Sequence, residues 1–325
     1  MKAQSLVVFP GQGSQFPGMG KAWFENFPLY REVIEEASDA CSLDFKKLSF
    51  DASESEIRDT EIAQPLILTV SCGMWKVLNS VFGFKEKVEA KIYAGHSLGE
   101  YTALVCSDVL SLKEAASTVM LRGRFMKEAC PIGLGGMRAL ILRESVGREK
   151  LLELCEVVSK QSKLIALANW NTDTQVVLSG FNEGLQYLDT LVGKDEWKWV
   201  RRSIPLEVSG PFHSPLMEKA TEKLGVVLES LKFSASSAQY IPNVSGEICS
   251  LESAQKIQTN LKAQVAGGVQ WYPGLLSIKD QVTHHIEVAP SKVLTGMVAR
   301  VDSLKHWKNV HFEDPTKVEE VFSKI

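Results

Sequence analysis

The stretch IYAGHSLGEY, residues 92–101, places Ser97 between Gly95 and Gly99 directly after a short strand-like run. This Gly-x-Ser-x-Gly spacing is typical of a nucleophile elbow, where a strand turns so sharply into a helix that a flanking Cβ would collide with the turn. The serine is then strained, with its hydroxyl exposed. A helix starting at Leu98 adds amides and a positive dipole end, which favour negative charge on a substrate oxygen. The stretch therefore predicts acyl transfer at Ser97.

The bare pattern is weak, because a chain of this length contains it by chance about once in ten. Its context strengthens the prediction, since a strand-like run at 90–94 precedes it and an apolar helical run follows it. The alternative is a glycine-flanked turn in which Ser97 only caps the helix.

Composition indicates an ordinary globular chain of 325 residues, with 45% hydrophobic and 23% charged residues. A net charge of −3 gives no general attraction to nucleic acid or to an anionic membrane. The N-terminal apolar run is too short for a signal peptide, and no segment is long enough to span a bilayer. The six cysteines are scattered without metal-ligand spacing, which predicts reduced thiols in a cytoplasmic protein and no metal site.

Strand-like runs alternate with longer helical patterns, which predicts an α/β fold with a mainly parallel sheet. An amphipathic helix is also expected from about residue 314 to the end. The other main expected elements are a central strand at 6–9, helices at 63–82 and 111–129, and strands at 241–245 and 283–288.

The pattern changes between residues 137 and 203, where strand, helix, strand, strand, helix and strand follow one another. This βαββαβ order is the ferredoxin-like arrangement. We therefore expect 137–203 to form a subdomain inserted into a catalytic core made of 1–136 and 204–325. A cleft between the two parts is the expected active site.

A serine hydroxyl needs a base within hydrogen-bond reach. His213 is the best candidate, because it lies in a glycine- and proline-rich loop after the insertion, from which a side chain can reach across a cleft. The alternative is an ordinary loop histidine. The other histidines are less suitable: His96 is expected to point away from the serine, His284 and His285 to lie at a strand edge, and His306 and His311 to lie in the tail.

Five motifs in this order resemble the malonyl-CoA:acyl carrier protein transacylases of bacterial type II fatty-acid synthesis. The resemblance extends over essentially the whole chain and implies an α/β-hydrolase-like core with an inserted ferredoxin-like subdomain. The motifs are Gly-Gln-Gly-Ser-Gln at 11–15, Gly-His-Ser-Leu-Gly-Glu at 95–100, Arg-Gly at 122–123, Phe-His at 212–213 and Val-Leu-Thr-Gly at 293–296.

The resemblance assigns the catalytic roles. Ser97 becomes the nucleophile and His213 the general base and acid. In place of the acidic member of a hydrolase triad, the backbone carbonyl of Gln264 is expected to orient the imidazole. The backbone amides of Gln12 and Leu98 are the expected oxyanion hole.

The same resemblance assigns substrate-binding roles to Arg122, Gln12, Asn169, Asn171 and Phe212. A buried guanidinium facing the serine would select malonyl over acetyl groups, because its planar fork binds a carboxylate through two hydrogen bonds. From the sequence alone, an exposed helix-surface arginine is the favoured interpretation of Arg122, because arginine is rarely buried. The two asparagines could be turn residues between strands.

Two positions depart from the usual pattern of these transacylases. Arg138 stands where a small residue is common, and Trp170 is bulkier than most residues at its position, so the shape of the cleft rim is open. A basic group could meet an acidic carrier protein or the phosphates of coenzyme A, although solvated surface charge is the simpler interpretation. Its members are Lys198, Arg201 and Arg202.

The predicted reaction is ping-pong transfer of a malonyl group from malonyl-CoA to the phosphopantetheine thiol of acyl carrier protein, with coenzyme A as product. No metal or bound cofactor is expected, and a monomer is the default. The alternatives are an acyl hydrolase or esterase on the same elbow, a free-standing polyketide acyltransferase, and a non-catalytic docking module for carrier protein.

Overall fold

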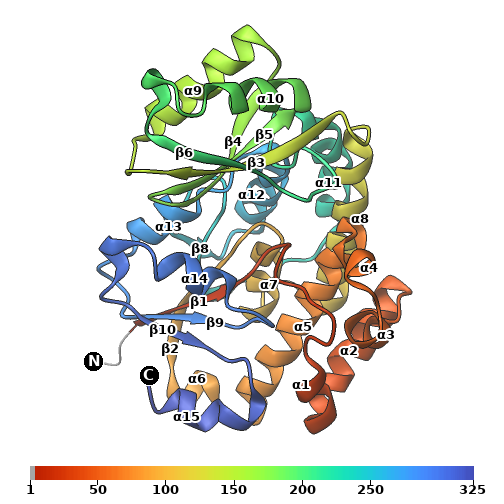
Figure 1. Cartoon of the computed structure of the whole chain (residues 1–325). Coiled ribbons are helices and arrows are strands. Elements are labelled where there is room, and N and C mark those ends of the chain that lie inside the picture. Colours follow the sequence, from red (N-terminus) through yellow and green to blue (C-terminus); the bar gives the residue numbers. More distant parts are fainter. Residues whose placement is uncertain (1–3) are drawn as a thin grey trace.

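The computed structural model describes residues 4–325 and contains two separate β-sheets (Figure 1). The larger sheet has six strands in the order β10-β9-β1-β2-β7-β8, all parallel except the short edge strand β8. The smaller sheet has four antiparallel strands in the order β4-β5-β3-β6. The chain is therefore an α/β protein with a mainly parallel sheet and a second, antiparallel one.

The central strand β1 (Gln4–Phe9) lies between β2 (Glu89–Gly95) and β9 (His284–Glu287). Residues 6–9 are completely buried, which is typical of a parallel strand covered on both faces. Parallel strands of a sheet end at the same edge, so β1 and β2 deliver their following loops to one place. Those loops carry Gln12 and Ser97.

The expectation that His284 and His285 lie at a strand edge is wrong. Both side chains are buried, because β9 pairs with β1 on one side and with β10 (Lys308–His311) on the other. His285 stacks on Trp307, with ring centroids 6.3 Å apart. These two histidines are therefore packing residues of the sheet.

Two long helices pack against each other beside the large sheet, α5 (Thr60–Ser80) and α8 (Leu112–Ala129) (Figure 1). The first begins three residues before the expected start, because the Asp59 side chain accepts a hydrogen bond from the amide of Glu61 and caps it. The second begins as expected after Ser111, whose hydroxyl accepts from the amide of Glu114. The expected terminal helix is short, α15 (Val318–Phe322).

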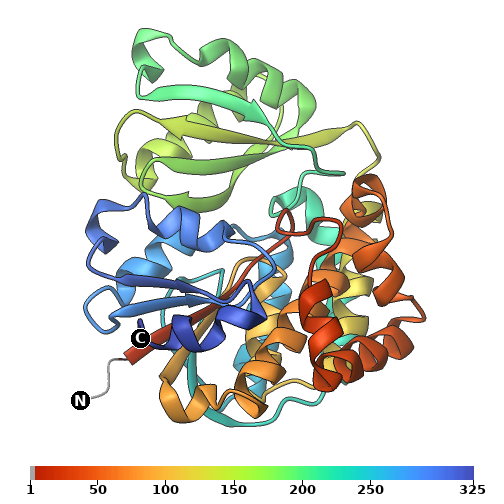
Figure 2. The ribbon, with the colours of Figure 1, turned by 60° about the horizontal axis from the view of Figure 1, so that its bottom comes forward.

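The small sheet has its own layer of helices and its own apolar core, and we call this unit the small layer and the rest the large layer. Figure 2 shows the small layer as a separate body above the large one. Leucine side chains of its strands and helices form a core distinct from that of the large layer. In chain order its elements are β3 (Gly135–Leu142), α9 (Arg148–Gln161), β4 (Ile165–Thr172), β5 (Gln175–Phe181), α10 (Asn182–Leu191) and β6 (Val200–Pro205).

The two layers are joined by backbone hydrogen bonds as well as by the chain. The amide of Trp170 donates to the carbonyl of Val269, and the amide of Val269 donates to the carbonyl of Ala168. These bonds fix β4 over the segment that precedes α13 (Trp271–Ser277).

The strand expected at 241–245 is displaced toward the N-terminus, since β7 (Ser236–Ile241) ends where Pro242 begins a turn. The remaining helices and strands complete the large layer. They are α1 (Lys21–Asn26), α2 (Pro28–Cys41), α3 (Phe45–Phe50), α4 (Glu54–Arg58), α6 (Phe84–Lys87), α7 (Gly99–Cys106), α11 (Glu218–Ser230), β8 (Cys249–Leu251), α12 (Ala254–Ala266) and α14 (Val293–Val298).

Across residues 4–325, none of the helices has both the length and the apolar character to cross a membrane. The same residues contain no group of three or more histidine, cysteine or acidic side chains arranged to hold a metal ion. All six cysteines are buried and unpaired.

Candidate active site

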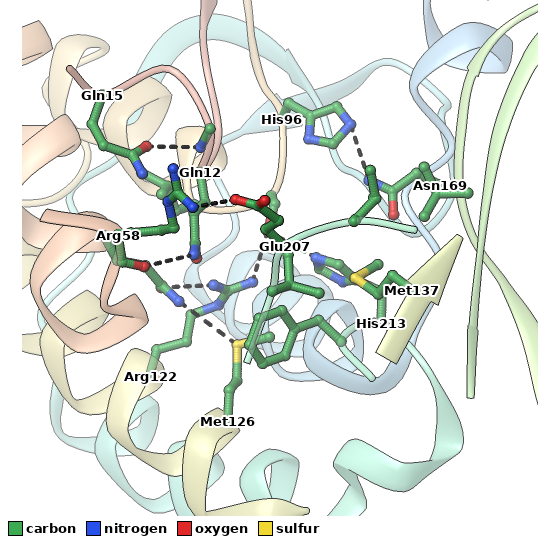
Figure 3. A pocket seen from close by; sticks show the side chains of 18 of the residues that line it. Gln12, Gln15, Arg58, His96, Arg122, Met126, Met137, Asn169, Glu207 and His213 are labelled. Atoms are coloured by element: carbon green, nitrogen blue, oxygen red, sulfur yellow. Dashed lines mark hydrogen bonds and ion pairs between the residues drawn. The ribbon is translucent and has the colours of Figure 1, made fainter. Parts of the chain in front are cut away.

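A cavity of about 270 Å³ opens between the two layers, and it is lined by residues from both (Figure 3). The large layer contributes the loop after β1, the elbow after β2, helix α8 and the loop that precedes α11. The small layer contributes Met137, Asn169 and Val177 from β3, β4 and β5. The cleft expected between the two parts of the chain is present.

The elbow has the strained geometry that its glycines predict. Ser97 has φ of 53°, in the left-handed region that non-glycine residues rarely adopt. A Cβ on Gly95 would lie 1.9 Å from the carbonyl carbon of Gly99, and a Cβ on Gly99 would lie 2.2 Å from the carbonyl oxygen of Phe9. Only glycine fits at both positions, so the backbone at Ser97 is fixed by its neighbours.

Ser97 and His213 meet although 116 residues separate them. The Oγ of Ser97 lies 2.8 Å from Nε2 of His213, a hydrogen-bond distance. The other ring nitrogen, Nδ1, lies 2.9 Å from the carbonyl oxygen of Gln264 and 3.2 Å from that of Gly267. Because carbonyls only accept, Nδ1 carries the proton and the lone pair of Nε2 faces the serine. The arrangement suits a general base.

His213 is buried and, like Ser97, has a positive φ, of 56°. Burial, together with the positive charge of Arg122, lowers the pKa of His213 to about 3. The imidazole is therefore neutral at ordinary pH and ready to take a proton. The positive φ was not foreseen, although the loop before it was expected to aim this side chain.

Arg122 is buried, with 1% of its surface exposed, so the alternative of an exposed helix-surface arginine is wrong. Its Nη1 donates to Oε1 of Gln64 at 2.7 Å. Its Nη2 donates to Oε1 of Gln264 at 2.8 Å and to Oγ of Ser97 at 3.1 Å. Arg122 and His213 point toward one another across the cavity in Figure 3.

The guanidinium of Arg122 is held by neutral oxygens. Among the described residues, no carboxylate forms an ion pair with it, and its Nε has no hydrogen-bond partner. A buried cation without an ionic partner is costly unless an anion joins it. The site therefore suits a substrate that carries a carboxylate a short distance from its reacting carbonyl.

Gln264 contacts every member of this group. Its main-chain carbonyl accepts from His213, as expected, and its side-chain Oε1 accepts from Arg122. Its Nε2 donates to the main-chain carbonyl of Ser97 at 2.9 Å and to Oε2 of Glu100 at 2.8 Å. The side-chain role of Gln264 was not predicted.

The expected oxyanion-hole amides lie at the ends of β1 and β2. Gln12 lies in the loop after β1, and Leu98 precedes the first residue of α7. Both residues line the cavity, and within the part of the chain that the structure describes neither amide has an acceptor. The amide of Ser97 is occupied, because it donates to Oδ1 of Asn243 at 2.7 Å. The oxyanion role of Gln12 and Leu98 stays a prediction.

The expected substrate-binding residues divide into two groups. Asn169 and Phe212 line the cavity, whereas Asn171 does not and instead places its Oδ1 2.9 Å from Nε2 of His96. His96 was expected to point away from the serine, but its ring forms part of the cavity wall and lies 3.3 Å from Nδ2 of Asn169. The two asparagines thus join the small layer to the elbow.

The two positions that depart from the usual pattern of the transacylases, Arg138 and Trp170, lie outside the cavity lining. Arg138 forms an ion pair with Asp189 at 3.2 Å, and Trp170 packs against Tyr272 with ring centroids 5.9 Å apart. The basic side chains of residues 198, 201 and 202 are exposed. The rim instead includes an ion pair between Arg58 of α4 and Glu207 of the segment that returns from the small layer.

Sequence reasoning missed three polar residues that hold the site. Gln64 binds Arg122, Asn243 binds the amide of Ser97 and the carbonyl of Gly95, and Glu100 binds Gln264. Glu100 belongs to the elbow motif, which was the only available signal for it. Gln64 precedes a proline and Asn243 follows one, each among apolar residues, and this context suggests no chemical role.

Residues 6–311 match the family model described as the acyl transferase domain. A malonyl CoA-acyl carrier protein transacylase of Bacillus subtilis is 38% identical over 314 residues, covering 96% of this chain and 94% of that protein. The acyl-carrier-protein S-malonyltransferase of Bartonella henselae has a similar structure, with a TM-score of 0.90, 32% identity and 99% coverage of both chains. A malonyl-transacylase solved in complex with its type II polyketide acyl-carrier protein has a TM-score of 0.89 and 32% identity, covering 99% of this chain and 100% of that chain.

Proposed function

This chain belongs to the acyl transferase domain family, and we propose that it transfers malonyl groups from malonyl-CoA to the phosphopantetheine thiol of an acyl carrier protein. One observation carries the choice of substrate. The buried guanidinium of Arg122, with no ionic partner among residues 4–325, lies within 3.1 Å of the hydroxyl that His213 activates. A malonyl thioester supplies both a carbonyl for the hydroxyl and a carboxylate for the guanidinium.

In the first half-reaction, Oγ of Ser97 attacks the thioester carbonyl while Nε2 of His213 takes its proton. The amides of Gln12 and Leu98 receive the negative charge that develops on the carbonyl oxygen. The tetrahedral intermediate then collapses, the carbon–sulfur bond breaks, and coenzyme A leaves with the proton from His213. The product is a malonyl ester on Ser97.

In the second half-reaction, the carrier thiol gives its proton to Nε2 of His213 and attacks the malonyl ester. Collapse returns the proton to Ser97 and releases malonyl carrier protein. Arg122 holds the malonyl carboxylate in the interval, and the burial of Arg122 and His213 limits access of water to the ester. All of these steps use groups of one chain, so the mechanism calls for no metal or organic cofactor and is compatible with a monomer.

The base is held differently from that of a triad hydrolase. In a triad hydrolase an acidic side chain accepts from Nδ1, whereas here two main-chain carbonyls do so.

We propose a cytoplasmic location, which the six unpaired buried thiols support. The choice between a fatty-acid and a polyketide carrier depends on carrier surfaces outside this chain.

We also propose that the chain divides into an α/β-hydrolase-like catalytic core, residues 1–136 and 204–325, and a ferredoxin-like subdomain, residues 137–203. The separate apolar core of the small layer supports this division. So does the strand order β4-β5-β3-β6, in which the first and last strands of the unit, β3 and β6, are neighbours.

The test is a transfer assay with malonyl-CoA and a carrier protein that bears its phosphopantetheine arm. We expect malonyl carrier protein to form in step with the release of coenzyme A. Carrier protein without the arm is the matched control and should remain unmodified. Release of free malonate at the same rate with and without carrier would contradict transfer and favour a hydrolase.

A further inference from the structure

Glu100 is a buried carboxyl group that the proposed steps leave unused. It lies in the first turn of α7, three residues after Ser97, and its side chain is completely buried. Its Oε2 accepts from the main-chain amide of Asn243 at 3.0 Å and from Nε2 of Gln264 at 2.8 Å. Its Oε1 has no partner among residues 4–325. A buried carboxyl group is costly to keep, so its contacts need an explanation.

The bond to Gln264 determines which way that side-chain amide points. Nε2 of Gln264 faces two acceptors, Oε2 of Glu100 and the main-chain carbonyl of Ser97. The amide oxygen, Oε1, then faces the N–H donors of Arg122. A flipped amide would set oxygen against two acceptors and its NH₂ group against the guanidinium, which has no acceptor. Glu100 therefore favours the orientation that holds Arg122.

The bond from Glu100 to Asn243 helps to hold the main chain around the nucleophile, Ser97. The side chain of Asn243 accepts from the amide of Ser97 at 2.7 Å and donates to the carbonyl of Gly95 at 2.6 Å. Because Glu100 holds the main chain of Asn243, one carboxyl group connects the strained elbow with the residue that orients both Arg122 and His213.

Glu100 also acts on Arg122 through its charge, without touching it. Burial lowers the pKa of Arg122, and Tyr101 and Glu100 nearby act in the opposite direction. Burial raises the pKa of Glu100 to about 7, and Oε2 can accept hydrogen bonds in either protonation state. The orientation of Gln264 is thus kept across the ordinary pH range.

We propose that Glu100 is a positioning residue for acyl-group selection: it orients the Gln264 side chain, and through it the guanidinium that binds the malonyl carboxylate. This inference rests on the proposed malonyl transfer. It assigns no direct contact between Glu100 and the substrate.

The test compares Glu100→Leu with Glu100→Gln. Leucine fills a similar volume without hydrogen-bonding atoms, whereas the oxygen of glutamine can still accept from both Asn243 and Gln264. The measured quantity is kcat/KM for malonyl-CoA divided by kcat/KM for acetyl-CoA, each for transfer to carrier protein. This ratio does not depend on how much of each preparation is folded, so a purely structural role would leave it unchanged.

We expect Glu100→Leu to lower the ratio about tenfold, the loss that follows when a charged hydrogen-bond acceptor is removed. Glu100→Gln should keep the ratio within about threefold of the wild type, since the two bonds are preserved. Gln264→Met should lower the ratio as much as Glu100→Leu. Because Glu100 acts through Gln264, the double variant should lose no more than either single variant.

The matched control is Glu287→Leu. Glu287 is an equally buried glutamate, but its carboxylate accepts from the amides of Leu294 and Thr295 at the start of α14 and not from site residues. This variant should lose stability and leave the ratio unchanged. If Glu100→Leu does not fold, Glu100→Asp carries the test, because its shorter side chain draws the oxygen away from Gln264.

The outcomes separate the two proposals. A wild-type enzyme that does not prefer malonyl-CoA would overturn the proposed function. A wild type that prefers malonyl-CoA, with the same preference in Glu100→Leu or Glu100→Asp, would overturn the positioning role alone. A fall in the ratio equal in Glu100→Gln and Glu100→Leu would also overturn it, because charge rather than amide orientation would then decide selection.

Discussion

The two layers contribute to the site in different ways. In the large layer, His213, Gln264 and Arg122 each make at least two polar contacts and are buried. In the small layer, Asn169 lies 3.3 Å from His96, and its Oδ1 is without a partner in the described chain. The large-layer groups are fixed by several bonds, whereas Asn169 keeps a hydrogen-bonding atom at the cavity wall that no described residue occupies.

Backbone strain follows the same division. Ser97 and His213 both have positive φ, and both are held by surrounding hydrogen bonds and close packing. Within the small layer, residues 135–205, only Gly193 has a positive φ, of 88°. We therefore expect changes at Ser97 and His213 to reduce the chemical step, a change at Arg122 to alter acyl-group selection, and changes in the small layer to weaken substrate binding with little effect on the chemical step.

Replacing the nucleophile gives the largest expected effect. Ser97→Ala should lower kcat for transfer by about 10³-fold or more, because the proposed acyl ester loses the oxygen on which it forms. The matched control is Ser107→Ala, which removes another buried serine hydroxyl. Within residues 4–325 that hydroxyl bonds only the carbonyl of Leu104. Steady-state transfer rates measure both. If Ser97→Ala transferred malonyl groups at the wild-type rate, Ser97 would not be the nucleophile, and the chain would be better described as a docking module for carrier protein.

The second-largest effect is expected for Arg122→Met. We expect kcat/KM for malonyl-CoA to fall about 10²-fold, because the malonyl carboxylate would be buried without a partner. The loss for acetyl-CoA should be much smaller. Arg124→Met is the matched control on the same helix, since Arg124 is exposed and paired with Glu61. If Arg122→Met lost kcat/KM equally for malonyl-CoA and acetyl-CoA, the guanidinium would have no part in acyl-group selection.

The pH dependence tests how the large layer holds its base. The neutral imidazole is the active form, so activity is lost as pH falls through the pKa of His213, which burial lowers to about 3. We expect His213 to cause no loss of kcat/KM for acetyl-CoA near pH 6.5 and to cause a decline only as the pH approaches about 3. In Arg122→Met the decline should move to higher pH, because the positive charge that lowers the pKa of His213 is gone.

Glu100→Gln gives the companion profile. Burial raises the pKa of Glu100 to about 7, and glutamine removes that titration, so a change near pH 7 that disappears in Glu100→Gln belongs to Glu100. A decline in the wild type centred near pH 6.5 and retained in Glu100→Gln would show that His213 titrates as an ordinary exposed histidine.

The smallest expected effect is in the small layer. Asn169→Ala should raise KM for malonyl-CoA about fivefold, the value of one hydrogen bond, with little change in kcat. Initial-rate measurements over a range of malonyl-CoA concentrations separate the two constants. A fall in kcat with constant KM would place Asn169 with the catalytic groups and would break the division between the layers.

The sequence was most informative where one short motif determines local geometry. The glycines around Ser97 predict the strained elbow, because each excludes a Cβ by direct collision. The loop around His213 made this histidine the best candidate for the base, with an ordinary loop histidine as the alternative. The resemblance to known transacylases then assigned its role and that of the carbonyl of Gln264.

The missed residues act through contacts between distant segments. Gln64 reaches Arg122 across 58 residues, and Asn243 reaches Ser97 across 146. Nothing in their neighbouring residues indicates which segment they will meet. The same reason explains the error at His284 and His285, because the burial of β9 depends on its neighbours β1 and β10 rather than on its own composition.

The most direct test of the account is isolation of the acyl-enzyme. After brief incubation with malonyl-CoA, intact-protein mass spectrometry and peptide mapping should find one malonyl group, located on Ser97. Carrier protein bearing its phosphopantetheine arm should then remove that group rapidly, while buffer alone removes it slowly. An adduct on another residue, or none while malonyl-CoA is consumed, would contradict the assignment of Ser97 as the nucleophile of a transferase.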